Sequence, residues 1–125
     1  MANWIYVGIG GFAGSVARYW LSGLVYRWLD STWLPWGTLA VNILGCLLIG
    51  LLAGLADVRQ LLSAQSRLLL MVGFLGGFTT FSTFGYELFT VAREGQVGLA
   101  LLNMGLHIVL GVAAVWLGYG AARAL

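Results

Sequence analysis

Residues 73–85 read Gly73-Phe-Leu-Gly-Gly-Phe-Thr-Thr-Phe-Ser-Thr-Phe-Gly85, and this stretch decides how the chain folds. It places paired glycines and a run of hydroxyl side chains in a segment without charged residues, a composition that favours a break in a helix. A membrane tolerates such a break only where the freed backbone groups face protein or a water-filled cavity. Channels and transporters use these groups to coordinate ions. The alternative is a kinked but continuous helix whose hydroxyls bond back to its carbonyls, and spacing alone leaves both interpretations open.

The composition on either side of this stretch is that of a membrane protein. Hydrophobic residues make up 61% of the 125 residues and charged residues only 8%, and the mean hydropathy is +0.95. A soluble domain needs a larger polar surface than this. The length accommodates four membrane spans of roughly 20 residues each, with little chain left over. The formal charge of +2 comes from few, scattered groups, which excludes a nucleic-acid-binding surface.

Charge-free stretches predict an all-α fold with four spans, the third of them broken near its centre. The predicted spans are residues 4–24, 37–56, 68–91 and 97–122. Aromatic residues near the span ends suit the headgroup level of a bilayer. They are Trp4, Tyr6, Tyr26, Trp28, Trp33, Trp36 and Tyr119.

The first span is expected to be retained and not cleaved as a signal peptide. Such a peptide needs a basic segment before its apolar run, whereas residues 1–17 carry no charge. We therefore predict a multi-pass protein of the plasma membrane. The single cysteine, Cys46, has no partner in the chain for a disulfide and is expected to be a small packing residue.

Ionisable and amide side chains within the spans are candidates for function, because burying them in a bilayer costs free energy. They are Arg18, Asn42, Glu87, Asn103 and His107. Arg18 lies in a span without a carboxylate, which favours an anion as the permeating species; alternatively it lies at the interface or pairs with Glu87. Asn42 offers an amide N–H to an anion, or makes an interhelical hydrogen bond. His107 lacks the neighbouring ligands that a metal site requires.

Phe81 and Phe84 are three residues apart and so share one face of a helix, with Glu87 continuing the same row. The edge of an aromatic ring is electropositive, so two rings presented by their edges could stabilise a small dehydrated anion. From the residues alone, packing in the core or against lipid is the simpler interpretation of both.

Taken together, three segments resemble the CrcB/Fluc family of fluoride channels. They are Gly10-Gly-Phe-Ala-Gly-Ser-Val-Ala-Arg-Tyr19, Gly37-Thr-Leu-Ala-Val-Asn42 and Gly73-Phe-Leu-Gly-Gly-Phe-Thr-Thr-Phe-Ser-Thr-Phe84. The resemblance implies an antiparallel, dual-topology homodimer in the lipid bilayer, with two fluoride pores and a structural sodium ion at its centre. Fluoride, formed in the cell from hydrogen fluoride that enters at low external pH, would leave through the pores. The channel would thereby confer fluoride resistance.

The resemblance also implies roles for single residues. Phe81, Phe84 and Asn42 would line the fluoride pore, with Ser82 and Thr83 in a polar track beside them. Backbone carbonyls of Gly76 and Thr79 would bind sodium at the helix break. Arg18 and Glu87 match charged positions near the pore or its vestibule. Many members carry a serine where this chain has Gly111, so one pore hydroxyl is missing here.

The main alternative function is a small dual-topology transporter that exports toxic cations or drugs. That class is similar in size but uses a glutamate in its first span, where this chain has Arg18. A structural subunit of a larger membrane complex would need neither the broken span nor the hydroxyl run. An enzyme is not expected, because no paired carboxylates, nucleophile with base, or metal ligands converge.

Overall fold

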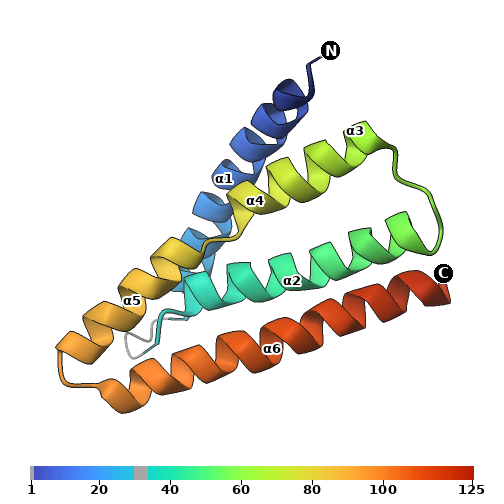
Figure 1. Ribbon diagram of the computed structural model, residues 1–125. Coiled ribbons are helices and arrows are strands. Elements are labelled where there is room, and N and C mark those ends of the chain that lie inside the picture. The colour runs from blue at the N-terminus through green and yellow to red at the C-terminus, as the bar shows by residue number, and fades with distance from the viewer. Residues whose placement is uncertain (1, 30–33) are drawn as a thin grey trace.

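The structure is a computed structural model that describes residues 2–29 and 34–125. Within these ranges all regular secondary structure is helical (Figure 1). In chain order the elements are α1 (Asn3–Trp28), α2 (Trp36–Asp57), α3 (Ala64–Arg67), the π-helical segment η1 (Leu68–Phe74), α4 (Leu75–Phe78), α5 (Phe81–Arg93) and α6 (Val97–Ala124). Trp33 and residues 30–32 of the first predicted connection lie outside the described ranges.

The described part of the chain contains three helical segments that are long and apolar enough to cross a bilayer. They are Trp36–Asp57, Ala64–Arg93 and Val97–Ala124. The 26-residue helix α1 is not among them, and it carries Arg18 together with several glycines and aromatic residues. The protein is therefore an all-α membrane protein, while the fourth span stays a prediction. Large apolar side chains lie exposed along these helices, as a protein bathed in lipid requires, among them Phe12, Trp20, Val109, Trp116 and Leu117.

The helices pack in two groups, which Figure 1 shows side by side. Helix α2 runs along α6, and α1 runs along the continuous stretch formed by α3, η1 and α4. Between the two groups lies a small core of Val41, Leu75 and Phe78, against which Leu21 and Leu52 pack. Helix α4 ends inside this core. The two residues that follow it, Thr79 and Thr80, interrupt the helical stretch between α4 and α5, and we call them with their immediate neighbours the interrupted segment. This segment therefore lies between the two groups of helices.

Helices α2 and α6 approach closely at two glycines. A Cβ atom on Gly118 would overlap the backbone carbonyl of Leu47, and one on Gly50 would overlap that of Val115. Lipid tails provide no hydrophobic force between helices, so close backbone contact of this kind is what holds them together. Gly120, two residues after Gly118 on the same helix, faces open space.

This packing predicts different effects for two similar substitutions. Gly118→Ala should lower the free energy of unfolding by about 1–3 kcal/mol, the usual penalty for an overpacked contact. Gly120→Ala, the matched control, should leave it unchanged or raise it slightly, because alanine favours helix more than glycine does. Thermal unfolding in detergent, followed by circular dichroism, measures both. Equal unfolding temperatures for the two variants would contradict the close packing of α2 on α6.

Candidate functional site

Helical geometry stops after α4 and resumes at α5, with two residues of extended backbone between them. Thr79 has φ −86° and ψ 156°, and Thr80 has φ −149° and ψ 116°. Thr80 also begins the next helix, because its hydroxyl accepts a hydrogen bond from the Thr83 N–H at 3.2 Å, the ordinary role of threonine at a helix N-terminus. The sequence around residues 76–80 thus ends one helix and starts another.

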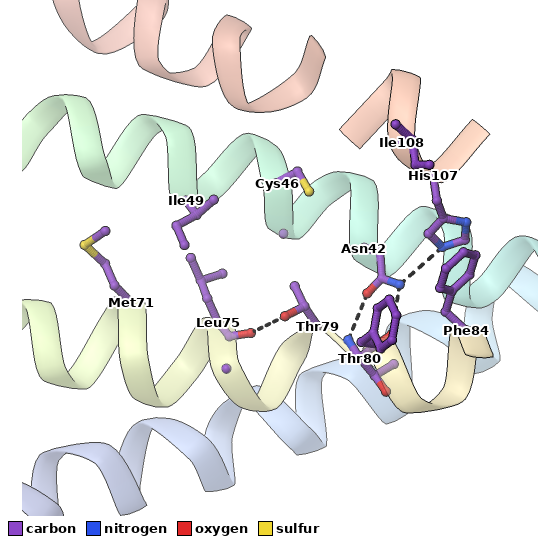
Figure 2. A pocket seen from close by; sticks show the side chains of 13 residues that line it. Asn42, Cys46, Ile49, Met71, Leu75, Thr79, Thr80, Phe84, His107 and Ile108 are labelled. Atoms are coloured by element: carbon purple, nitrogen blue, oxygen red, sulfur yellow. Dashed lines mark hydrogen bonds between the residues drawn. The ribbon is translucent and has the colours of Figure 1, made fainter. Parts of the chain in front are cut away.

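Asn42 of α2 binds the interrupted segment through both ends of its amide. Its Oδ1 accepts a hydrogen bond from the Thr80 N–H at 2.9 Å, and its Nδ2 donates to the Thr80 carbonyl at 3.1 Å (Figure 2). In a continuous helix the Thr80 N–H would bond instead to the carbonyl of Gly76. The Asn42 side chain therefore replaces a helical hydrogen bond and releases the Gly76 carbonyl from it.

Arg18 of α1 reaches the same segment from the opposite group of helices. Its Nε donates to the Gly77 carbonyl at 3.0 Å, so the guanidinium lies at the C-terminal end of α4, where a helix carries partial negative charge. This contact places the cation beside the interrupted segment. The hydrogen bond of Arg18 is thus to a backbone carbonyl and not to Glu87, the carboxylate considered as its partner, while its position relative to the bilayer interface stays a prediction.

Glu87 of α5 is bound instead by a residue that the sequence did not single out. The Thr38 hydroxyl donates to Glu87 Oε1 at 2.6 Å, and the other oxygen, Oε2, is buried without a hydrogen-bond partner among the described residues. Thr38 and Asn42 are four apart on α2, and this spacing was the available signal that both point the same way.

The rings of Phe81 and Phe84 lie with their centroids 5.8 Å apart and at 62° to each other, an edge-to-face arrangement. Their surroundings differ sharply: Phe81 is 83% exposed and Phe84 only 8%. Phe84 also packs on the imidazole of His107, with 4.1 Å between ring centroids. The shared helix face predicted for the two phenylalanines therefore has one ring facing outward and one fixed inside.

Phe81, Phe84 and His107 border an open groove of about 470 Å³ between the two groups of helices (Figure 2). Its wall is mostly apolar, with polar groups gathered at the interrupted segment. The lining residues are Asn42, Gly45, Cys46, Ile49, Met71, Leu75, Gly76, Thr79, Thr80, Phe81, Phe84, His107 and Ile108. Five predicted site residues thus meet here, namely Asn42, Gly76, Thr79, Phe81 and Phe84.

The remaining predicted site residues lie outside this groove. Arg18 and Thr83 border a separate small cavity of about 60 Å³, together with Thr38 and Thr80. Ser82 is exposed, with its hydroxyl 3.3 Å from that of Thr80. The backbone at Thr80 is therefore shared by the groove and the small cavity. Sequence reasoning missed Thr80, although its position before the apolar start of a helix is typical of a cap.

Gly111, at the position where the resemblance implies a serine, packs against α2. A Cβ atom there would lie 3.4 Å from the sulfur of Cys46. Gly111 itself is not part of the groove wall, whereas Cys46 is. That distance is an ordinary van der Waals contact, so Gly111 and Cys46 are neighbouring packing residues on facing helices.

Comparison with known proteins gives one family along nearly the whole chain. A family model described as "CrcB-like protein, Camphor Resistance (CrcB)" matches residues 5–119. A "Fluoride-specific ion channel FluC" of Methylobacillus flagellatus is 49% identical over 113 residues, covering 90% of this chain and 88% of the relative. A protein of the same name from Geobacter sulfurreducens is 46% identical over 125 residues, covering all of both chains. A third, from Acidobacterium capsulatum, is 44% identical over 116 residues, covering 93% and 92%.

Proposed function

The chain belongs to the CrcB family, and from this premise we propose that it is a fluoride-selective channel through which fluoride leaves the cell passively. It is not an enzyme. Relatives that match almost its full length are named fluoride-specific ion channels, so export of drugs or toxic cations is not favoured. The observation that carries the proposal is the groove in which the rings of Phe81 and Phe84 flank the segment bound by Asn42.

The chemistry of this groove suits a small anion. A fluoride ion entering the bilayer loses water, and a channel must replace that water with groups of the opposite polarity. Ring edges at Phe81 and Phe84 carry partial positive charge. The hydroxyls of Ser82 and Thr83 are donors for a polar track alongside, and the cation of Arg18 beside Gly77 favours an anion nearby. Glu87, hydrogen-bonded to Thr38, would lie at a vestibule.

No energy source is needed for this transport. Hydrogen fluoride crosses the membrane at low external pH and dissociates in the more alkaline cytoplasm, where the anion is trapped. A membrane potential that is negative inside drives the anion outward with about 2.3 kcal/mol per 100 mV. A passive pore in the plasma membrane is therefore sufficient to lower fluoride in the cell.

We infer that four spans and a second copy of the chain complete the pore. Helix α1 is 26 residues long, which is enough to cross the hydrocarbon. In a single copy, Gly76 and Phe81 are exposed at the interrupted segment, and backbone polar groups facing lipid cost several kcal/mol each. A partner related by a two-fold axis in the membrane plane would cover this segment with its own copy. An antiparallel homodimer would therefore shield both Gly76 and Phe81 from lipid.

A sodium ion at the centre of this dimer fits the groups present. The Thr80 N–H donates to Asn42 and not to the Gly76 carbonyl, and Gly76 faces open space. The carbonyls of Gly76 and Thr79 would hold the ion, and both are uncharged oxygen ligands of the kind that bind alkali cations in membrane proteins. When bound, the ion would neutralise the carbonyl dipoles that converge from the two copies.

Exchange of sodium for a larger cation tests this site. Purification in N-methylglucamine should weaken dimerisation and slow fluoride flux, and return to sodium should restore both. Crosslinking of the dimer and fluoride release from vesicles provide the two measurements. Lithium, small enough for the same carbonyls, is the control for ionic strength. Dimers that are equally stable in all three solutions would contradict a structural sodium ion.

The proposed function itself is tested by growth. Expression of the chain in a bacterium without its own fluoride exporter should restore growth on fluoride, and more strongly at acidic than at neutral external pH, where less hydrogen fluoride enters. The Phe84→Ile variant, expressed to the same level, should not restore it. Growth that the chain fails to restore at any pH would contradict fluoride export.

A further inference from the structure

His107 lies in the middle of a chain of hydrogen bonds that ends on the interrupted segment. Its Nδ1 is 2.9 Å from Asn103 Oδ1 and 3.1 Å from the Asn103 backbone carbonyl. On the other side of the ring, its Nε2 is 3.2 Å from Asn42 Nδ2. Figure 2 shows the imidazole, the Asn42 amide and Thr80 in one line. Helix α6 is thereby connected through α2 to the segment between α4 and α5.

The partners of Nδ1 decide where the proton of the neutral ring lies. A backbone carbonyl can only accept a hydrogen bond, so Nδ1 must be the donor to Asn103. A neutral imidazole has one N–H, which leaves Nε2 as an acceptor. The 3.2 Å contact is therefore a hydrogen bond donated by Asn42 Nδ2 to His107 Nε2.

This proton position in turn fixes the amide of Asn42. With Nε2 as an acceptor, Nδ2 faces His107 and the Thr80 carbonyl, and Oδ1 faces the Thr80 N–H. In the other tautomer two donors, Nε2–H and Nδ2–H, would face each other. Rotating the amide would relieve that contact but would turn its NH₂ group toward the Thr80 N–H. Only one tautomer of His107 is thus compatible with all three bonds of Asn42.

Burying the amide of Asn103 is energetically unfavourable, and its hydrogen bond to His107 explains why an amide is present at this position. Its side chain is 2% exposed, and its Nδ2 has no hydrogen-bond partner among the described residues. An unpaired buried donor is unfavourable, and an apolar side chain of similar shape would avoid it. Within residues 2–29 and 34–125, the one hydrogen bond of this side chain is the bond that its Oδ1 accepts from Nδ1 of His107.

We propose that Asn103 is a positioning residue that fixes His107 as its Nδ1–H tautomer, so that His107 holds the Asn42 amide on the interrupted segment. The effect extends to Phe84, whose ring packs on the imidazole at 4.1 Å. The consequence for ion flux rests on the proposed fluoride channel. The tautomer and its dependence on Asn103 do not, because they require no ion.

The tautomer can be observed directly, since His107 is the only histidine in the chain. Isotope-labelled histidine gives one pair of ring-nitrogen NMR signals from the protein in lipid vesicles, at a pH above the titration range of imidazole. The wild type should show the proton on Nδ1. In Asn103→Leu the backbone carbonyl, 3.1 Å from Nδ1, still favours the Nδ1–H form, but the shorter bond to Oδ1 is lost, so a minor Nε2–H population should emerge. Fluoride flux should fall by about tenfold, the effect of one lost hydrogen bond.

Two further variants separate positioning from packing. His107→Gln places an amide oxygen near the position of Nε2 and should keep most of the flux, whereas His107→Asn mimics only Nδ1 and should lose it. These variants also serve if Asn103→Leu does not assemble. A wild-type ring with its proton on Nε2 would overturn the proposal, as would equal flux in the two His107 variants. If the wild type shows Nδ1–H but passes no fluoride, the proposed function fails while the tautomer assignment holds.

Discussion

Phe84→Ile should reduce fluoride flux by roughly a hundredfold, the effect of raising the barrier by about 3 kcal/mol. Isoleucine fills much of the volume but has no electropositive ring edge to replace the water that fluoride loses. The substitution also removes the contact between the Phe84 ring and the imidazole of His107, whose centroids are 4.1 Å apart. Flux is measured as fluoride release from vesicles that contain equal amounts of each protein.

Phe81→Ile is expected to act in the same direction through the ring edge alone. Phe81 is 83% exposed in a single copy, and Phe12 on α1 is 76% exposed but is not part of the groove wall. Phe12→Ile is therefore the matched control for loss of an exposed ring, and it should conduct normally. If Phe81→Ile also conducts normally while remaining dimeric, Phe81 is a packing residue and the pore lies elsewhere.

Forcing one orientation in the membrane should abolish activity, because the proposed antiparallel dimer needs both orientations. The chain has six arginines and no lysine. Arg59 donates to the carbonyls of Ala122 and Arg123, and Arg67 donates to that of Ala56, so these three arginines gather at one end of the bundle. Arg27 and Arg93 lie in the last turns of α1 and α5, at the other end. The difference in positive charge between the two ends of the bundle, which normally sets the orientation of a membrane protein, is therefore small.

Two lysines added after Leu125 should tip this balance and hold the C-terminus in the cytoplasm. That variant should be inactive alone. Coexpression with Glu94→Lys/Gln96→Lys, which biases the opposite end, should restore fluoride flux. Two glutamates added after Leu125 are the control, since acidic residues contribute little to orientation. A variant shown by labelling to insert in one direction only, and yet fully active, would contradict antiparallel pairing.

The helices could be predicted closely from the sequence, because few charges interrupt the apolar stretches. Residues 97–122 were expected in one helix, and α6 runs from Val97 to Ala124. The first helix was harder to classify: its glycines, aromatic residues and Arg18 lower its apolarity although its length is sufficient. The π-helical turn over Leu68–Phe74 has no signal in composition, since it depends on how the segment packs against α1.

Individual site residues could be predicted, but not their partners. Polarity inside an apolar span singles out Asn42, yet nothing in one sequence says that it binds Thr80, 38 positions away. The bond between Thr38 and Glu87 spans 49 positions, and that between Asn42 and His107 spans 65. Such contacts arise from tertiary packing, which periodicity and local propensity do not encode.

The most direct measurement for the channel itself is ion release from liposomes that hold purified wild-type protein and are loaded with both fluoride and chloride. With a potassium ionophore to balance charge, an ion-selective electrode follows each anion in the same sample. A fluoride-selective channel should release fluoride rapidly while chloride stays inside until detergent is added. Equal release of the two anions, or retention of both, would contradict a fluoride-selective channel.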